Sequence, residues 1–306
     1  MGYGAMEKNK GIGTVYILLS AILWGTAGIF VRGLDSFGIH SMQTVFCRAV
    51  FTVLFLALYM ALFDRKKFRV HWKDLWLFAA TGLFSIVLFN YCYYRTMGLA
   101  TLSFAAVLLY TAPIFVMIFS VFLFGEKMTL RKTAACLAAF LGCCFVSGLF
   151  EGKQSFSSAA LGFGLLTGFG YALYTIFGTY LLRRNYDSLT ITFYVFLFAS
   201  IFSMFLCDAG TAIRTTFTNR GALFFVIGMA MINTVLPYIF YTNGLQSVSA
   251  SQAPILATLE PVVATLFGTV LFHEPIRLNG FIGIALVIFS IILLNVQKRR
   301  KRQNET

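Results

Sequence analysis

Long apolar runs alternate with short polar connections along the whole chain. A helix that spans a membrane needs roughly 20 mostly apolar residues, and each run has about that length. The runs lack the strict alternation of barrel strands, and a helix satisfies its own backbone hydrogen bonds in lipid. We therefore predict an all-α polytopic membrane protein with ten transmembrane helices, at residues 12–31, 41–62, 75–96, 101–124, 131–149, 159–182, 189–206, 221–242, 249–272 and 279–296.

The two halves of the chain repeat one pattern. Pro113 is followed by twelve residues and Glu126, and Pro261 is followed by twelve residues and Glu274, 148 positions further along the chain. A duplicated apolar unit indicates a repeat architecture. The pattern predicts two repeats of five helices each, covering residues 12–149 and 159–296 and followed by a basic tail at 297–306.

An odd number of helices in each repeat fixes their relative orientation. The second repeat must enter the membrane from the opposite face, so the halves are expected to be inverted repeats. Such an arrangement suits alternating access, because exchanging the conformations of the two halves turns an inward-open site into an outward-open one.

The composition and the distribution of charge agree with a membrane protein. The chain is 59% hydrophobic and 11% charged, whereas a soluble domain is about 25% charged. The net charge of +13 does not indicate nucleic-acid binding, because the basic residues lie mainly on one side of the predicted spans: 17 lie on the side of the N-terminus and 6 on the other side. Connections rich in Lys and Arg usually stay on the cytoplasmic side of a membrane. We expect both termini in the cytoplasm, a location in the plasma (bacterial inner) membrane, and a tail that contacts anionic lipid.

The sequence shows no apparatus for catalysis. The six cysteines lie within or beside apolar runs without a metal-like spacing, and the three histidines lie in or next to different loops. There is no HExxH motif, nucleophile elbow or phosphate-binding loop. We therefore expect no enzyme activity, no metal and no cofactor.

Several short motifs occur in a characteristic order. These are Trp24-Gly25 in helix 1, Arg48 in helix 2, Gly125-Glu126 at the end of helix 4 and Leu259-Glu260-Pro261 in helix 9. With the duplication, they make the chain resemble EamA-type members of the drug/metabolite transporter superfamily over nearly its whole length. The resemblance implies an exporter or exchanger of small metabolites, amino acids among them. It also implies a central cavity lined by helices 1, 3, 4, 6, 8 and 9, with helices 5 and 10 at the periphery.

Glu260 is the candidate residue with the clearest chemical reason. It lies near the middle of helix 9, where an unpaired ionised carboxylate is costly and demands a partner, water or a proton. It is therefore a candidate to bind a substrate amine or a coupling proton. The alternative is that it fixes the helix break beside Pro261, and the equivalent position of the first repeat is Ala112.

Arg48 lies seven residues inside the predicted span 41–62, whereas the other basic residues lie in connections or within two residues of a span end. Its long side chain can extend to the outer interface, or its guanidinium can meet a carboxylate or helix-end carbonyls. We expect it to be a structural charge. An ion pair between Arg48 and Glu260 requires contact between helices 2 and 9, which the sequence does not determine.

Prolines and aromatic residues complete the candidate site. Pro113 and Pro261 are repeat mates and remove helical hydrogen-bond donors, so they are candidate gating positions or, alternatively, static kinks. Pairs three or four residues apart share a helix face and can form an amphipathic wall, although a chain with 17% aromatic residues shows such pairs by chance and tyrosine also favours membrane interfaces. The candidate substrate-binding residues are Trp24, Asn90, Tyr94, Tyr110, Tyr171, Tyr174, Tyr238, Tyr241, Gln252 and Glu260.

The favoured function is a secondary transporter that moves a small amphipathic metabolite, such as an amino acid. The alternatives are a lipid-carrier flippase and a membrane-embedded enzyme acting on a lipid, but the acids expected outside are scattered among different loops. Small residues recur every fourth position in helices 5 and 6 and permit close helix contact within one chain or in a homodimer.

Overall fold

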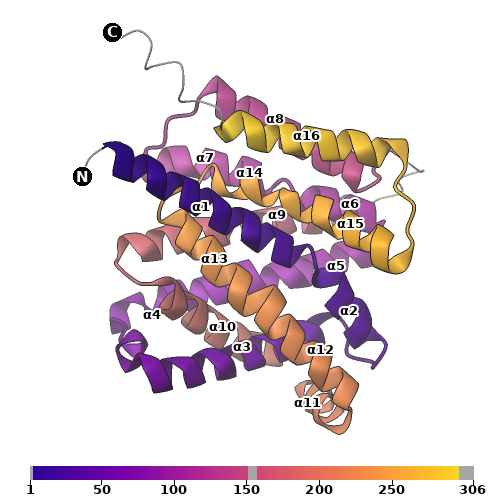
Figure 1. Cartoon of the computed structure of the whole chain (residues 1–306). Helices are drawn as coiled ribbons and strands as arrows, with labels where there is room; N and C mark the ends of the chain where they lie inside the picture. Colours follow the sequence, from indigo (N-terminus) through magenta and orange to yellow (C-terminus); the bar gives the residue numbers. More distant parts are fainter. Residues whose placement is uncertain (1–2, 151–156, 296–306) are drawn as a thin grey trace.

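The computed structural model describes residues 3–150 and 157–295, and for residues 3–10 it describes the backbone alone. Within these residues all regular structure is helical, as the sequence predicted. The helices run roughly along one direction, and the start of the first and the end of the last lie at the same end of the bundle (Figure 1). The basic tail predicted at 297–306 lies outside the described residues.

Helices of the first repeat follow the predicted spans, several of them in pieces. The first span consists of α1 and α2, the second of α3, and the third of α4, a π-helical stretch and α5; the fourth consists of α6 and α7, and the fifth of α8. Their bounds are α1 Tyr3–Trp24, α2 Ala27–Asp35, α3 Ser41–Phe63, α4 Leu75–Ala80, the π-helical stretch Thr81–Leu88, α5 Phe89–Leu99, α6 Leu102–Leu109, α7 Ala112–Phe124 and α8 Leu130–Val146.

Helices of the second repeat follow the same order. The sixth span is α9, the seventh α10, the eighth α12 with a π-helical stretch and α13, the ninth α14 and α15, and the tenth α16. Their bounds are α9 Ser158–Arg183, α10 Ser188–Met204, α12 Arg220–Ala230, the π-helical stretch Met231–Val235, α13 Leu236–Leu245, α14 Ala253–Ala257, α15 Leu259–Phe272 and α16 Leu278–Asn295.

Most predicted spans are long enough to cross a membrane. Eight helical segments in the described part of the chain meet the requirements of length and apolar composition, or nine if α10 and the helix after it count as one bent span. The remaining predicted span corresponds to α8, which has 17 residues, as α10 also has. Both are at the short end of the range for spanning helices.

Interruptions occur at equivalent places in the two repeats. The fourth span breaks at Tyr110-Thr111 and the ninth at Thr258, and the third and eighth spans both contain a π-helical stretch. At each break a threonine hydroxyl donates to a carbonyl three residues earlier, with 2.6 Å from Thr111 to Leu108 and 2.6 Å from Thr258 to Ile255. The helices are therefore interrupted at equivalent places near Pro113 and Pro261, each just before the proline, which is tolerated in the first turn of a helix.

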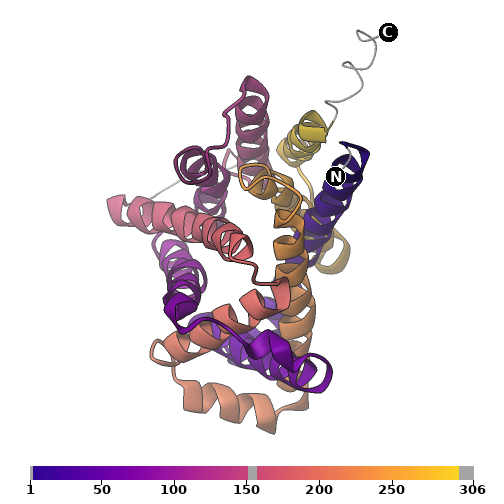
Figure 2. The same ribbon diagram turned by 90° about the vertical axis from the view of Figure 1, so that its left-hand side faces the viewer.

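Small residues allow helices of this chain to approach closely. A Cβ at Gly283 of α16 would lie 2.6 Å from the Gly142 carbonyl oxygen of α8, and one at Gly168 of α9 would lie 2.6 Å from the Leu108 carbonyl oxygen. The small-residue positions predicted in helices 5 and 6 thus serve contacts inside the chain. Viewed along the helices, α8 and the yellow α16 lie together at one edge of the bundle (Figure 2).

The sequence did not predict α11, Ala209–Thr218, which follows α10 at an angle of 110°. Its N-terminus is capped by Asp208, whose carboxylate accepts a hydrogen bond of 3.0 Å from the Thr211 backbone nitrogen. Ala212 and Thr216 are buried, whereas Phe217 is exposed. This amphipathic helix occupies the connection for which the sequence predicted no helix, at the edge of the bundle opposite α8 and α16 (Figure 1).

Candidate functional site

Five of the predicted aromatic residues meet at one place in the middle of the bundle. Trp24 at the end of α1 has its ring 5.3 Å from the ring of Tyr238, 5.3 Å from that of Tyr241 and 6.3 Å from that of Tyr171. Tyr174 lies 4.9 Å from Tyr238. We call these five residues the aromatic cage. They combine α1 of the first repeat with α9 and α13 of the second, at edge-to-face and tilted angles that aromatic pairs prefer.

The cage encloses a small cavity. Ser85 and Thr175 line it together with the five rings, and its volume of about 10 Å³ is about that needed for one water molecule. Two tyrosine hydroxyls form hydrogen bonds with threonine hydroxyls, Tyr174 with Thr242 at 3.0 Å and Tyr241 with Thr175 at 2.7 Å. The rings are therefore fixed in orientation, and they close tightly around the cavity in this conformation.

Asn233 holds the break in the first span. This residue lies in the π-helical stretch of the eighth span and is buried, and its amide nitrogen donates to the carbonyl oxygens of Leu23 at 2.9 Å and Trp24 at 3.2 Å. Carbonyls at a helix end need such partners. Sequence reasoning missed Asn233, although a lone asparagine inside an apolar span was a signal for a buried polar contact.

Replacing Asn233 with alanine should destabilise the fold, because two carbonyls at the end of α1 lose their donor. An unsatisfied buried polar group costs about 1–3 kcal/mol. We expect the Asn233→Ala protein in detergent to unfold at a temperature several degrees below the wild type. The control is Asn295→Ala. The Asn295 amide is exposed and donates at 2.9 Å to a carbonyl of its own helix, so this substitution should change the unfolding temperature little. Equal effects of the two changes would contradict the role of Asn233.

Glu260 lies next to the cage, in the first turn of α15 and two residues after the break at Thr258. It lies in the neighbourhood of Tyr93, Tyr110 and Tyr171, which belong to the third, fourth and sixth spans. The residue is only half-buried, so part of its side chain remains accessible. No described residue forms a hydrogen bond or an ion pair with its carboxylate. The group is free to bind a cation or a proton.

Close packing of the break in the first span on α15 fixes the position of Glu260. A Cβ at Gly25, in the break of the first span, would lie 2.7 Å from Cβ of Val263 and 3.0 Å from the carbonyl oxygen of Glu260. The break in the first span therefore rests directly on the backbone of the break in the ninth. Only glycine permits this contact.

Three predicted residues are placed differently. Asn90 is buried, and its amide donates to the Ile86 carbonyl of its own helix at 2.7 Å instead of lining the cavity. Tyr94 is absent from the cage, and its ring contacts the ring of Tyr93 at 6.2 Å. Gln252 precedes α14, so the assumption of one continuous helix from Gln252 to Glu260 was wrong, because the break at Thr258 separates them.

Arg48 does not extend to the membrane interface. It is 8% exposed, and its Nε atom is buried without a hydrogen-bond partner. Among the described residues no ion pair joins Arg48 to Glu260 or to another acid.

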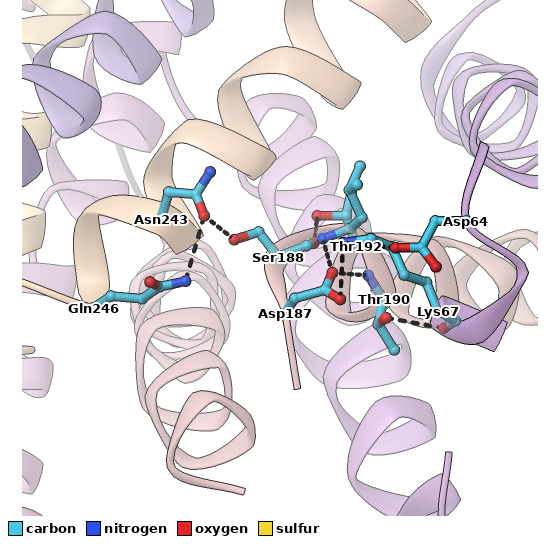
Figure 3. A network of polar contacts seen from close by, with 9 residues as sticks. Asp64, Lys67, Asp187, Ser188, Thr190, Thr192, Asn243 and Gln246 are labelled. Atoms are coloured by element: carbon cyan, nitrogen blue, oxygen red, sulfur yellow. Dashed lines mark hydrogen bonds and ion pairs between the residues drawn. The ribbon is translucent and has the colours of Figure 1, made fainter. Parts of the chain in front are cut away.

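Polar contacts join the two repeats at the end of the bundle where α1 begins. We call this end the basic face; it contains the connections 64–74, 125–129, 184–187 and 246–252. Asp74 accepts hydrogen bonds from Arg184 and, at 2.7 Å, from Tyr186. Lys67 pairs with Asp187 at 3.1 Å, and Lys132 donates to Ser251 at 2.8 Å. Figure 3 shows Lys67 of the second-to-third connection beside Asp187, which precedes α10, and Ser188 at the start of α10 bonded to Asn243 of α13.

The opposite end is joined by fewer charges in the described part of the chain. Arg32 pairs with Glu274 at 2.6 Å, and both side chains are about half exposed. Because solvent weakens exposed pairs, this contact contributes little to stability. On the basic face, a pocket of about 620 Å³ lies between the end of α9 and the connection 246–252, with Leu245 and Glu126 among its lining residues.

The fold and the site define an integral membrane protein in which two similar helical repeats enclose an aromatic cavity with a free carboxylate beside it. The chain belongs to the EamA-like transporter family, which it matches over residues 11–148 and 158–296. This placement confirms the resemblance drawn from the sequence.

The relatives are themselves described only as transporters. An uncharacterised transporter of Archaeoglobus fulgidus is 27% identical over 92% of this chain and 95% of its own length. The uncharacterised inner membrane transporter YicL of Salmonella typhimurium is 24% identical over 94% of this chain and 97% of its own length. A protein crystal structure with 15% identity has a TM-score of 0.76 over 94% of this chain and 98% of that chain, a likeness of fold alone.

Proposed function

We propose that this protein is a secondary transporter that moves a small amphipathic metabolite, such as an amino acid, by alternating access. The observation that carries the proposal is the free carboxylate of Glu260 beside the aromatic cage, where interrupted spans of both repeats meet. Ring faces attract apolar groups and cations, and a carboxylate adds a strong partner for an ammonium group. Interrupted spanning helices at a repeat interface are typical of transporter binding sites.

The two symmetric breaks supply the proposed moving parts. Each of the fourth and ninth spans consists of two helices joined at a threonine next to Pro113 or Pro261, so each half-helix can change its angle without breaking further hydrogen bonds. Movement of α6 and α14 relative to α7 and α15 would open one end of the cavity and close the other. In this conformation the cavity has room for about one water, so the cage must open to admit a metabolite.

We infer that the polar contacts across the basic face hold that end closed. Asp74 is 6% exposed and binds Arg184 and Tyr186 of the other repeat. We also propose that this face is cytoplasmic, because the connections there and the two ends of the chain carry most of the basic residues. The transporter would be driven by a substrate or ion gradient, since the sequence has no ATP-binding motif.

Removing the Asp74 carboxylate should open the basic face. The Arg184 side chain is 38% exposed, so the relevant cost is that of a hydrogen bond to a charged group, about 1.5–3 kcal/mol, which shifts a two-state equilibrium about tenfold or more. We expect Asp74→Asn to raise the maleimide labelling rate of Leu245→Cys at least tenfold, in a protein without its six native cysteines. Leu245 is 7% exposed and lies between the basic-face pocket and the cage.

The matched control for this experiment is Asp64→Asn. The Asp64 carboxylate lies 3.9 Å from the Lys67 ammonium, and both residues belong to the same connection, so this contact does not join the two repeats. Asp64 is also more exposed than Asp74. Its substitution should leave the labelling rate unchanged. Equal labelling of Leu245→Cys with and without Asp74 would show that this ion pair does not close the basic face.

Counterflow tests the proposed function itself. The purified protein in liposomes preloaded with an unlabelled metabolite should accumulate the same labelled compound transiently, and a panel of amino acids and related metabolites is the first choice. Acceleration by an imposed pH gradient would indicate proton coupling, whereas indifference would indicate a facilitator or exchanger. Folded protein that carries no compound of the panel would contradict the proposal and favour a lipid substrate.

A further inference from the structure

A second cavity, on the side of the bundle, has no role in the proposed function. It has a volume of about 480 Å³ and lies between α3 of the first repeat and α10 and α13 of the second. We call it the lateral groove. Tyr59 and Leu236 belong to membrane spans and are 47% and 37% exposed, so the groove opens towards lipid. Its lining is mainly apolar and includes Phe55, Leu56, Tyr59, Met231, Leu236 and Ile239.

The lateral groove has the depth of one leaflet of a bilayer. Met231 and Asn243 both line it, and they are separated by about three helical turns, or roughly 16 Å, along the eighth span. The hydrocarbon core of a bilayer is about 30 Å thick, so one leaflet contributes about 15 Å. The groove therefore extends from the basic face, where Lys67 and Asn243 lie, to the middle of the eighth span, and this depth matches an acyl chain.

Both signs of charge occur at the polar end of the lateral groove, on the basic face. The Lys67 ammonium lies 3.1 Å from the Asp187 carboxylate and 3.9 Å from that of Asp64. The neighbouring Arg65 and Lys66 are exposed, and neither forms an ion pair with these acids among the described residues. Two carboxylates thus face one ammonium, so this cluster has room for a second cation.

Hydrogen bonds between the repeats fix these polar groups in place. The Thr190 hydroxyl donates to the Lys67 carbonyl at 2.9 Å, and the Asp187 carboxylate caps α10 by accepting from the Thr190 backbone nitrogen at 3.0 Å. The Asn243 amide oxygen accepts from the Ser188 hydroxyl, whereas its amide nitrogen has no hydrogen-bond partner among the described residues (Figure 3). The polar end therefore presents a positioned ammonium, a positioned carboxylate and a donor without a partner.

We propose that the lateral groove binds one phospholipid with an amine headgroup, such as phosphatidylethanolamine. One acyl chain lies along the apolar lining. The phosphate accepts hydrogen bonds from Lys67 Nζ and Asn243 Nδ2, and the lipid ammonium donates to the Asp187 carboxylate. A zwitterionic headgroup complements a polar end that carries both charges, whereas an anionic headgroup brings no cation for the second carboxylate. The bound lipid contacts both repeats, and no residue lines both this groove and the cavity of the aromatic cage.

Native mass spectrometry of the purified full-length protein tests this binding without a transport assay. The protein is titrated with three dioleoyl lipids: phosphatidylethanolamine, phosphatidylglycerol, which has no ammonium, and phosphatidylcholine, whose ammonium has no N–H. We expect one phosphatidylethanolamine molecule to bind at least about tenfold more tightly than either of the others, because a hydrogen bond between charged groups is stronger than a neutral one. Equal retention of the three lipids, or retention of none, would overturn the inference, and neither result depends on a variant.

Asp187→Asn tests the carboxylate. Asparagine caps a helix about as well as aspartate, so the change removes the charge and keeps the start of α10. We expect phosphatidylethanolamine to bind at least about tenfold more weakly and to lose its preference over phosphatidylglycerol. The matched control is Asp208→Asn, because Asp208 caps α11 by accepting from Thr211 at 3.0 Å, far from the lateral groove. Equal binding by the two variants would show that the Asp187 carboxylate does not hold the headgroup.

A phosphatidylethanolamine with a photoactivatable diazirine in its acyl chain locates the apolar part of the site. After illumination, peptide mass spectrometry should find the label on residues 55–59 of α3 and 231–239 of the eighth span, which line the lateral groove. An excess of unlabelled phosphatidylethanolamine should remove this label by competition. Labelling that no excess lipid reduces, or competed labelling confined to other segments, would overturn the assignment of the lipid to this groove.

Discussion

Replacing Glu260 with glutamine should reduce counterflow of a substrate that carries an ammonium group by ten- to a hundredfold. The change removes the negative charge and preserves the size of the side chain beside the aromatic cage. A hydrogen bond to a charged group contributes about 1.5–3 kcal/mol, which corresponds to that range of rates if binding limits transport. Because no described residue pairs with the carboxylate, the substitution leaves no other buried charge unpaired, so the protein should still fold.

Glu274→Gln is the matched control for Glu260→Gln. Glu274 is also a glutamate of the second repeat, but it is about half exposed and paired with Arg32 at the end opposite the basic face. Its substitution should change counterflow by less than about twofold, as expected for an exposed ion pair. If the transport rate and its dependence on a pH gradient were the same in Glu260→Gln as in the wild type, Glu260 would have neither a substrate-binding nor a coupling role.

A methyl group added at Gly25 should damage both the packing of the first span and the candidate site. A Cβ there would lie 2.7 Å from Cβ of Val263 and 3.0 Å from the carbonyl oxygen of Glu260, closer than real Cβ atoms approach. The first and ninth spans would have to separate at the point where Trp24 and Glu260 are positioned. Overpacking of this kind costs about 1–3 kcal/mol. We expect Gly25→Ala to lower the unfolding temperature by several degrees and counterflow by at least tenfold.

Gly28→Ala provides the comparison for Gly25→Ala. Gly28 lies three residues further along in the same span, and a Cβ there would meet no atom within 4 Å. Its substitution should leave counterflow unchanged and should raise the helix propensity of α2 slightly. Equal activity of Gly25→Ala and Gly28→Ala would show that close packing of the first span on the ninth does not position the site.

The architecture was predictable because lipid imposes a length and an apolar composition on each span. The run predicted at 159–182 corresponds to α9, Ser158–Arg183, and the run at 279–296 to α16, Leu278–Asn295. The repeat of Pro113 and Pro261 also indicated that the fourth and ninth spans bend. The breaks begin a few residues before the prolines, since a proline fits the first turn of the helix that follows.

Parts of the site depend on contacts that no local pattern reveals. Asn233 caps a helix whose end lies 210 and 209 residues away in the sequence, so its role appears only when the spans are packed. Spacing correctly grouped Tyr171 with Tyr174 and Tyr238 with Tyr241, because α9 and α13 are regular there. Spacing failed for Gln252, which is separated from Glu260 by a helix break.

The central claim, that a metabolite binds at the aromatic cage, can be tested with the fluorescence of Trp24. The chain has three tryptophans, and the other two, Trp72 and Trp76, are 77% and 60% exposed near the basic face. A Trp72→Phe, Trp76→Phe protein therefore reports on the cage alone. We expect each compound that shows counterflow to change Trp24 emission in a saturable manner, and Glu260→Gln to weaken this binding at least tenfold. A compound that is carried while the emission of Trp24 stays constant at saturating concentration would place the transport site elsewhere.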